Sequence, residues 1–477
     1  MRVQMHINGA SQPSLSGELR PVLDPGTGEV TAHAAEGGRE DAQRAIAAAR
    51  AAFDAGPWPA MAPAERAELL DRLADLIQRD KEELAALETR DTGKTLEESR
   101  WDMGDVTDVI RYYADLACGL VDEPLDAPSP SGRSVLVREP VGVCSMILPW
   151  NYPLLQASWK LAPALAAGCT VVMKPSELTP LTTVRFNELI AEAGCPAGVV
   201  NTVLGPGHSV GAELAESLDV DLVSFTGGVK TGRGILRAAS ANVKKVALEL
   251  GGKNPHIIFD DADLDTAVDQ ALGAVFFHAG QICSAGARLM LAESIHDAFV
   301  ERLVARVRRI RVGHGTDPTT QMGPLISAAH RDSVDAFVQR ALAQGARLLV
   351  GGKRPEDAGT GFYYEPTVLG GCSADMEIVR EEVFGPVISV ETFRTEAEVV
   401  ALANDTPFGL SAGFWTSDRE RIHRVSRALR FGTVWVNAFN VYFAAAPWGG
   451  YKQSGIGREL GRAGLDEYME CKHVYED

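Results

Sequence analysis

Between positions 141 and 252 the chain alternates short apolar runs with longer segments in which apolar residues recur every three or four positions. The apolar runs are VGVCSMILP, CTVVMKP, GVVNTVLG, VDLVSFTG and KKVALELGG. Short apolar runs are typical of strands, and a spacing of three and four is typical of helices. Because the two kinds of segment alternate with short links, the pattern predicts a parallel β-sheet with helices on both faces.

The rest of the chain predicts further elements around this sheet. After a short β start, helical spacing predicts helices over 39–56 and 62–94, and Pro57, Pro59 and Pro63 mark the break between them. A second α/β unit begins after Gly252, with helices expected over 262–280, 294–310 and 329–345 and loop-to-strand segments over 377–393 and 432–440. Two more predicted strands, at 131–140 and 466–477, lie outside both units, which is typical of strands that make subunit contacts.

Polar clusters follow the predicted parallel strands almost one for one. They read PWN, KPSE, GPGHS, FTGG and ELGG, and each stands where an apolar run ends. Sheets of this kind bind ligands beyond the carboxyl ends of their strands. The sequence therefore predicts a ligand site along this edge.

Composition and charge narrow the class of protein. The net charge of −18 argues against nucleic acid or an anionic membrane as the main partner. The densest basic run, RVRRIRVGH, has the spacing of a solvated helix face. Seven widely spaced cysteines without a CxxC motif predict a reducing compartment, no histidine pair has the spacing of metal ligands, and the N-terminus lacks a signal peptide. A cytoplasmic enzyme without a metal site is the expectation.

Three residues have the character of a catalytic set. Cys283 lies in GQICSAGAR, where small residues suit either a tightly packed site or a thiolate approached by ligands. Glu249 ends an apolar run in ELGGKNP, so burial can raise its pKa and make it a base near neutral pH, although a carboxylate that caps a turn would look the same. Asn151 in PWNYP offers an amide donor to an oxyanion or to a turn.

Two further clusters have the character of a nucleotide site. Lys174, Ser176 and Glu177 follow the second strand, where dinucleotide-binding folds place an acidic residue against ribose hydroxyls. Gly227 and Gly228 open a helix, whose N-terminus favours phosphate. By itself this glycine pattern is not the GxGxxG fingerprint.

Taken together, these motifs resemble the aldehyde dehydrogenase superfamily over essentially the whole chain. The motifs PWNYP, KPSE, FTGG, ELGGKNP, GQICSAGAR, EEVFGPV and PWGGYKQSGIGRE occur in the order found in that family, with Gly228 where the family more often has serine. The resemblance implies an α/β fold in which residues 1–121 and 142–250 form a Rossmann-like dinucleotide-binding domain. It further implies a catalytic domain over 251–448 and oligomerisation strands within 122–141 and 462–477, and hence a homodimer or homotetramer.

The resemblance also implies a chemistry. Cys283 would attack the aldehyde to form a thiohemiacetal, Asn151 and the Cys283 backbone N–H would hold the oxyanion, and hydride transfer to NAD or NADP would leave a thioester. Glu249 would activate the water that hydrolyses this thioester, and Lys160 and Glu459 would form a proton relay. The retained glutamate favours hydrolysis over acyl transfer to coenzyme A. The positions implied to bind the cofactor are Leu148, Pro149, Trp150, Lys174, Ser176, Glu177, Gly207, Phe225, Thr226, Gly227, Gly228, Thr231, Leu250, Gly251, Glu382 and Phe384.

Within the superfamily, the chain is most similar to the betaine-aldehyde and aminoaldehyde branch, which surrounds a cationic substrate with aromatic rings. Matching positions are Tyr152, Trp159, Phe277 and Trp448, and the alternative is that they are ordinary core aromatics. Trp101, Asp102 and Asp105 match a cluster at the channel mouth of aminoaldehyde-oxidising relatives, where carboxylates attract an ammonium, and they also fit an exposed helix face.

Three alternatives stay open. Phe277 stands where many relatives have tryptophan, which leaves room for a neutral aliphatic or aromatic aldehyde. Some superfamily members are structural proteins without turnover, and these tend to lose the nucleophile or the base. Others run the reverse reaction on an activated acyl group. Glu177 favours NAD over NADP because its carboxylate should repel a 2′-phosphate.

Overall fold

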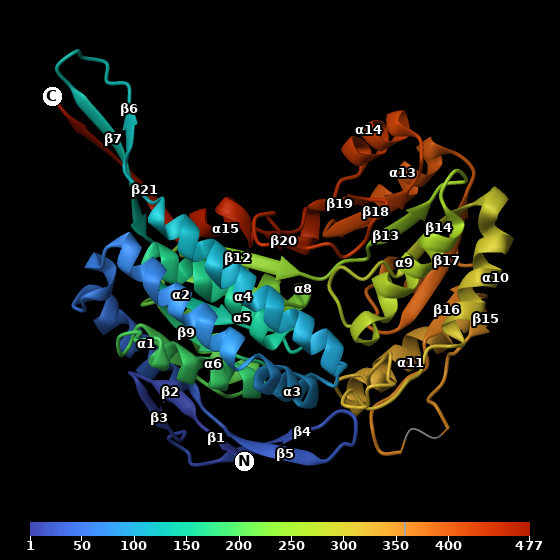
Figure 1. Cartoon of the computed structure of the whole chain (residues 1–477), viewed down its shortest axis with the longest axis horizontal. Helices are drawn as coiled ribbons and strands as arrows, with labels where there is room; N and C mark the ends of the chain where they lie inside the picture. Colours follow the sequence, from blue (N-terminus) through green and yellow to red (C-terminus); the bar gives the residue numbers. More distant parts are fainter. Residues whose placement is uncertain (357–358) are drawn as a thin grey trace.

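An eight-stranded sheet lies at the centre of the larger of two α/β bodies in the computed structural model, which describes residues 1–356 and 359–477 (Figure 1). Its strand order is β20-β12-β11-β8-β9-β10-β2-β3. The five predicted parallel strands form its middle, and three antiparallel strands complete the two edges. The parallel strands are β8 (Val143–Ile147), β9 (Thr170–Lys174), β10 (Val200–Thr202), β11 (Leu222–Gly227) and β12 (Lys245–Leu250), and the edge strands are β2 (Met5–Ile7), β3 (Ala10–Gln12) and β20 (Gly455–Ile456).

Helices cover this sheet, and α5 is buried along its whole length because it is packed between the sheet and the outer helices α2 and α4. The predicted helix over 62–94 is interrupted at Asp80, which caps the end of α2 and pairs with Arg79 and Arg185. The helices are α1 (Arg39–Asp54), α2 (Pro63–Arg79), α3 (Lys81–Thr92), α4 (Leu96–Cys118), α5 (Pro153–Ala167), α6 (Leu181–Glu192), α7 (Ala212–Glu216) and α8 (Val229–Ala239), with short turns η1 (Trp58–Ala60) and η2 (Gly207–Gly211).

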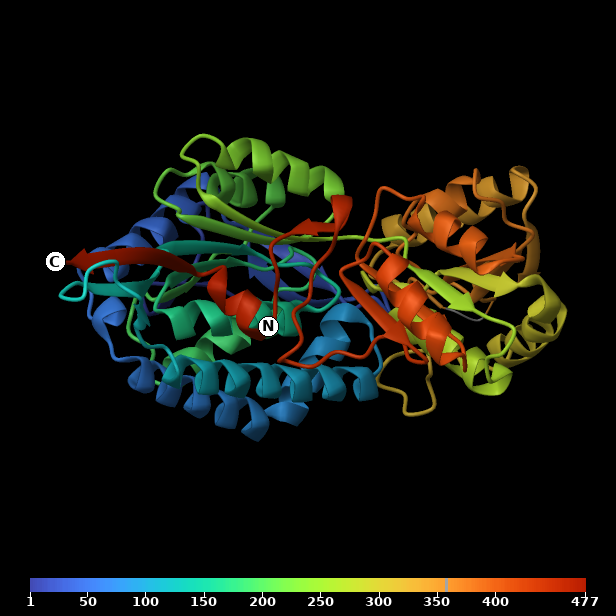
Figure 2. The same cartoon turned by 90° about the horizontal axis from the view of Figure 1, so that it is seen from above.

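The second body lies beside the larger one (Figure 2). It contains a seven-stranded sheet of order β15-β16-β17-β14-β13-β18-β19, parallel except for β15. Its strands are β13 (Pro255–Ile258), β14 (Arg288–Ala292), β15 (Arg347–Val350), β16 (Thr367–Gly370), β17 (Val387–Phe393), β18 (Ser411–Trp415) and β19 (Thr433–Val436). Its helices are α9 (Leu264–Phe276), α10 (His296–Val307), α11 (Ala328–Ala343), α12 (Glu377–Arg380), α13 (Glu396–Asn404) and α14 (Arg419–Ala428), with short turns η3 (Phe277–Gly280), η4 (Glu293–Ile295) and η5 (Lys452–Ser454).

Two helix ends differ from the prediction. The helix expected to reach Gly280 ends at Phe276, because His278 and Ala279 adopt left-handed backbone angles with φ of 46° and 51°. The carboxylate of Glu98 on α4 accepts the His278 backbone N–H at 2.7 Å and anchors this turn. Helix α10 ends at Val307, so most of the basic run RVRRIRVGH lies beyond the helix instead of along one of its faces.

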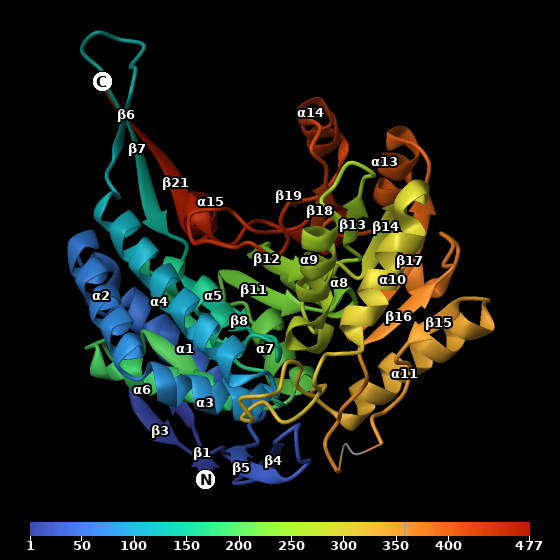
Figure 3. The same ribbon diagram turned by 45° about the vertical axis from the view of Figure 1, so that its right-hand side comes forward.

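A three-stranded antiparallel arm projects from the larger body (Figure 3). It consists of β6 (Glu123–Leu125), β7 (Arg133–Pro140) and β21 (Met469–Glu476), and β7 pairs with β21 along its full length. A fourth sheet joins β1 (Arg2–Val3), β5 (Val30–Ala35) and β4 (Leu19–Leu23), and α15 (Gly461–Asp466) precedes the arm. Across the described residues, none of the helices combines the length and the apolar character needed to cross a membrane.

Candidate active site

Cys283 lies where two cavities meet. One cavity of about 290 Å³, here the aromatic cavity, is lined by side chains from α4, α5, α9 and the segment after β19. The other, of about 740 Å³, lies along the carboxyl ends of the parallel strands and is here the strand-end cavity. The Cys283 side chain is half-buried and lines both. A ligand in either cavity can therefore reach the same sulfur.

The backbone around Cys283 is held from several sides. Gly280 has a φ of +73°, and a Cβ there would come within 2.2 Å of the Gly385 carbonyl oxygen. The Gln281 side chain accepts from the Ile326 N–H at 2.9 Å, and the Asn254 amide donates to the Cys283 carbonyl at 2.8 Å. The left-handed turn and these anchors present the cysteine at the junction.

Glu249 lies beside the cysteine at the end of β12 and is almost completely buried. Burial and the nearby Glu459 raise the pKa of Glu249 to about 8. Its Oε1 accepts the indole N–H of Trp448 at 3.2 Å, and its Oε2 has no hydrogen-bond partner among the described residues. Burial, and next the carboxylate of Glu249, raise the pKa of the Cys283 thiol well above its ordinary value. The thiol is therefore protonated near neutral pH and needs a base.

Asn151 follows β8 and lines the strand-end cavity. One N–H of its side-chain amide donates to the carbonyl oxygen of Gln281 at 2.9 Å, two positions before Cys283. This bond fixes the amide against the cysteine loop. The second N–H of the same amide is chemically suited to an oxyanion.

Lys160 and Glu459 form a buried ion pair behind this set. The Lys160 Nζ also donates to the Thr226 hydroxyl at 2.7 Å, and Thr226 donates to Gln156 at 3.0 Å. Glu459 lies close enough to raise the pKa of Glu249, and its Oε2 has no hydrogen-bond partner among the described residues. Lys160, Glu459 and Glu249 therefore form one buried cluster of ionisable side chains.

All sixteen positions expected to bind a dinucleotide line the strand-end cavity. The cavity is also lined by Arg20 from β4 and His330 from α11, which the sequence did not indicate. Both come from segments far along the chain from the parallel strands, and neither belongs to one of the motifs. Ile147 and Leu178 are further lining residues next to predicted ones.

The geometry of this cavity fits a dinucleotide. Gly228 is the N-cap of α8 with open space where a Cβ would lie, so backbone N–H groups face the cavity without a side chain in the way. Lys174 Nζ lies 3.3 Å from Glu177, which leaves an ammonium and a carboxylate side by side for ribose hydroxyls. At Gly251 a Cβ would come within 1.9 Å of Glu382, so only glycine allows that carboxylate its place.

The aromatic cavity contains most of the residues expected at a substrate site. Tyr152, Trp159, Phe277, Trp101, Asp102 and Asp105 all line it. Trp101 and Phe277 stack with nearly parallel rings, 5.7 Å between centroids. Phe439 and Tyr442 also line the cavity. The sequence analysis singled out neither residue, since Phe439 lies within the predicted segment 432–440, Tyr442 follows it, and no motif covers either.

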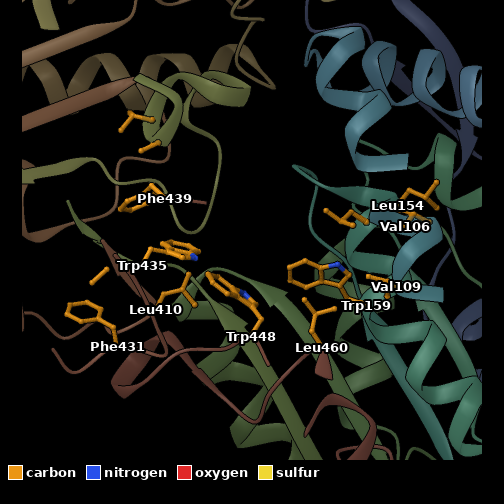
Figure 4. Packing of buried hydrophobic residues seen from close by; sticks show 14 of the residues in the cluster. Val106, Val109, Leu154, Trp159, Leu410, Phe431, Trp435, Phe439, Trp448 and Leu460 are labelled. Carbon is orange, nitrogen blue, oxygen red and sulfur yellow. The ribbon is translucent and has the colours of Figure 1, made fainter. Parts of the chain in front are cut away.

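Trp448 does not itself line the aromatic cavity, but its ring packs against the lining residue Tyr442 with 4.9 Å between centroids, and its role as a substrate contact stays a prediction. It is buried and stacks on Trp435 with 6.0 Å between ring centroids (Figure 4). Its indole N–H donates to Glu249. Its backbone is held by an isolated antiparallel bridge, since the Trp448 N–H donates to the Glu459 carbonyl oxygen and the Trp448 carbonyl oxygen accepts the Glu459 N–H. The ring therefore contacts both the Glu249 carboxylate and the aromatic side chains next to the cavity.

Asp102 is also not the free carboxylate that the sequence suggested. It is buried and accepts from Lys94 Nζ at 2.5 Å. The same ammonium lies 4.0 Å from the centroid of the Tyr152 ring. One carboxylate and one aromatic face of the predicted cation site are thus already occupied by a side chain of the protein.

Comparisons with known proteins agree with this geometry. The model of the aldehyde dehydrogenase family matches residues 13–474. The chain is 59% identical to the betaine aldehyde dehydrogenase of Bacillus subtilis, covering 96% of this chain and 94% of the relative. It is 44% identical to the peroxisomal aminoaldehyde dehydrogenase 2 of Pisum sativum, covering 99% and 95%.

Solved structures agree as well. A crystal structure of betaine aldehyde dehydrogenase from Staphylococcus aureus in complex with NAD⁺ matches with a TM-score of 0.98 and 51% identity, covering 99% of this chain and 94% of the other. The fold expected from the resemblance is confirmed. With a family model matched over nearly its whole length and a cysteine set between two ligand cavities, this chain belongs to the aldehyde dehydrogenase family.

Proposed function

We propose that this enzyme uses NAD to oxidise an aldehyde with a cationic terminus, betaine aldehyde or an ω-aminoaldehyde, to its carboxylic acid. The observation that carries the proposal is the position of Cys283 between an aromatic cavity and a cavity with dinucleotide-binding geometry. Relatives named betaine aldehyde and aminoaldehyde dehydrogenases support the substrate class, and the NAD⁺ complex of one relative supports the cofactor.

In the first step Cys283 attacks the carbonyl carbon of the aldehyde. A carbon–sulfur bond forms, the thiol proton passes to the adjacent Glu249, and the carbonyl oxygen becomes an oxyanion. The Asn151 amide and the Cys283 backbone N–H would hold this oxyanion, and a donor of this kind contributes about 3–4 kcal/mol to transition-state stabilisation. When NAD is bound, it accepts the hydride of the thiohemiacetal carbon, which leaves a thioester on Cys283.

In the second step Glu249 takes a proton from water, and the resulting hydroxide adds to the thioester carbon. The carbon–sulfur bond then breaks, which releases the acid and a Cys283 thiolate that takes the proton back from Glu249. Glu249 must lose a proton between the two steps. The Lys160–Glu459 pair supports a path for it, because Glu459 shares the buried space of Glu249 and has an oxygen without a hydrogen-bond partner among the described residues.

The preference for NAD follows from Glu177. Its carboxylate lines the strand-end cavity beside Lys174 and would accept from the ribose 2′-hydroxyl while repelling a 2′-phosphate. Arg20 lines the same cavity, but its guanidinium is paired with Glu36. Use of NADP as a second cofactor remains compatible with this arrangement.

A neutral aliphatic or aromatic aldehyde is the second candidate. Three observations favour it: Lys94 neutralises Asp102, the same lysine covers one face of Tyr152, and Phe277 supplies a weaker cation–π partner than tryptophan would. A structural role without turnover is the remote candidate, and the presence of Cys283, Glu249 and Asn151 speaks against it.

A substrate panel separates these candidates. The values of kcat/KM for betaine aldehyde, 4-aminobutyraldehyde and hexanal should be measured with NAD and with NADP, without coenzyme A. We expect kcat/KM to be higher for the cationic aldehydes than for hexanal, because a quaternary ammonium gains about 0.5–2 kcal/mol of binding free energy per good aromatic contact. A preference for hexanal would assign the enzyme to the second candidate, and no NADH formation to the third. The Cys283→Ala variant is the control for turnover at this site.

We also propose a domain division, a quaternary arrangement and a location. We assign residues 1–121 and 142–250 to cofactor binding, 251–448 to catalysis, and 122–141 with 462–477 to oligomerisation. The projecting arm exposes Leu125, Val474 and Tyr475, which supports its burial in a homodimer or homotetramer. Wide cysteine spacing supports a cytoplasmic enzyme. Sedimentation of the full chain beside a variant with charged residues at these three positions would test the assembly.

A further inference from the structure

Lys94 is a buried ammonium directly behind the aromatic cavity. Its side chain is fully buried, and its Nζ lies 2.5 Å from Asp102 and 3.8 Å from Glu88. The same Nζ lies over the ring of Tyr152, 4.0 Å from its centroid. Asp102 and Tyr152 both line the aromatic cavity, whereas Glu88 does not. The lysine therefore acts on two residues of the cavity wall from the side opposite to a substrate.

The turn that carries Lys94 is fixed by both bodies of the protein. Gly93 ends α3 with a φ of +83°, and Thr95 caps the start of α4. On the other side, the Leu96 N–H donates to the carbonyl oxygen of Gly315 at 2.9 Å, and a Cβ at Gly315 would come within 2.1 Å of the Lys94 carbonyl oxygen. Lys94 is thus held in place independently of its ion pair.

The charge on Lys94 has two consequences for a cation in the cavity. It cancels the charge of Asp102, so the nearest carboxylate offers a cation little attraction. It also occupies one face of Tyr152, and a cation on one face of a ring weakens the binding of a second cation on the opposite face, since both draw on the same quadrupole. Asp105, which also lines the cavity, makes no ion pair with any described residue.

We propose that Lys94 is a positioning residue for substrate choice. Its ion pair with Asp102 sets how strongly the aromatic cavity favours a cationic aldehyde, and Asp102 does not act as a direct counter-ion of the substrate. This inference rests on the proposed function, since it concerns the substrate that binds beside Cys283. Removal of Asp102 alone would leave the Lys94 ammonium facing the cavity, with Glu88 behind it. Removal of both Lys94 and Asp102 would take away one positive and one negative charge, so the net charge beside the cavity would stay as it is in the wild type.

The test is a double-mutant cycle with two aldehydes of equal shape. Betaine aldehyde and 3,3-dimethylbutanal differ in the replacement of a quaternary nitrogen by carbon, so the ratio of their kcat/KM values reports the charge preference alone. The variants are Lys94→Met, Asp102→Asn and the double variant, assayed at pH 8.5 with saturating NAD. A matched control cycle combines Lys94→Met with Asp105→Asn, because Asp105 lines the same cavity without an ion-pair partner.

We expect Asp102→Asn to lower the ratio about tenfold through an uncompensated ammonium, and the double variant to restore it to within about twofold of wild type. Lys94→Met alone should not lower the ratio. In the control cycle, Asp105→Asn should lower the ratio whether or not Lys94 is present. KM for betaine aldehyde should carry most of the change, since the groups act on binding.

A double variant as poor as Asp102→Asn would overturn the proposal, because Asp102 would then contact the cation itself. An unchanged ratio in Asp102→Asn would also overturn it. If Asp102→Asn does not fold, the double variant against wild type decides: equal ratios support the proposal and a lowered ratio refutes it. The proposed function is tested separately by the wild-type ratio of kcat/KM for the two aldehydes. The cycle depends only on how the variants change that ratio, so it remains informative whichever aldehyde the wild type prefers.

Discussion

Trp448 donates its indole N–H to the carboxylate of Glu249 across 3.2 Å, deep beside the cysteine. This bond favours the ionised carboxylate, so it lowers a pKa that burial has raised to about 8. Trp448→Phe keeps the ring and removes the bond, and the pKa of Glu249 should rise further. We therefore expect the pH profile of kcat to shift to higher pH. At a given pH, kcat should fall to a similar extent for betaine aldehyde and 3,3-dimethylbutanal. A loss of activity with betaine aldehyde alone would indicate that Trp448 contacts the substrate.

Glu249→Gln should slow the first half of the reaction, in which Glu249 accepts the thiol proton, and stop the hydrolysis that follows. The base that activates water is the carboxylate, which in the wild type forms as pH rises through about 8, so steady-state turnover limited by hydrolysis should increase across that range. The glutamine variant has no such base, and an acyl-enzyme should accumulate. Stopped-flow measurement should show at most one NADH per site at pH 8.5, followed by little turnover. Unimpaired steady-state turnover would exclude Glu249 as the base.

Asn151→Ala should reduce kcat about 10²–10³-fold, because one donor to the oxyanion is lost. The Asn151 amide also donates to the Gln281 carbonyl, so the cysteine loop could shift as a side effect. Asn151→Asp supplies the control, since it retains the size of the side chain and lacks the amide donors. Steady-state kinetics should show both variants impaired in kcat with a smaller change in KM for NAD. A normal kcat in either variant would argue against an oxyanion contact.

Phe277→Trp should raise kcat/KM for betaine aldehyde a few-fold relative to 3,3-dimethylbutanal. Tryptophan is the strongest cation–π partner, and the position lines the aromatic cavity in a stack with Trp101. Phe277→Leu is the matched control, which should lower the same ratio while keeping an apolar wall. Equal effects on both aldehydes would show that the position controls shape and not charge.

Glu177→Ser should shift the cofactor preference toward NADP. The substitution removes the carboxylate that would repel a 2′-phosphate, and it leaves Lys174 at the same edge of the strand-end cavity. KM for NADP should fall and KM for NAD should rise, measured with one aldehyde at saturation. Glu36→Gln, which frees the Arg20 guanidinium instead, should also favour NADP. An unchanged preference in both variants would place the ribose elsewhere.

Much of this architecture could be predicted from the sequence, because it depends on the pattern of apolar and polar residues at neighbouring positions. Strands β8 to β12 are nearly continuous apolar runs, and α5 ends at Gly168, where a positive φ requires glycine. Cys283, Glu249 and Asn151 stand at the carboxyl ends of elements or in a glycine-rich loop, so the motifs that contain them also place them near one another. The strand-end cavity follows from the same rule for parallel sheets.

What the chain pattern does not contain is the partner of each buried side chain. The helix α9 stops at Phe276 because Glu98, on another helix, accepts the His278 N–H. Asp102 looks like an open carboxylate until the turn before α4 brings Lys94 onto it. The hydrogen bond from Trp448 to Glu249 joins positions 199 residues apart, so the motif that contains Trp448 does not reveal it. Periodicity and motif order are properties of neighbouring positions, whereas hydrogen bonds and ion pairs depend on residues that only the packing of distant segments brings within a few ångströms.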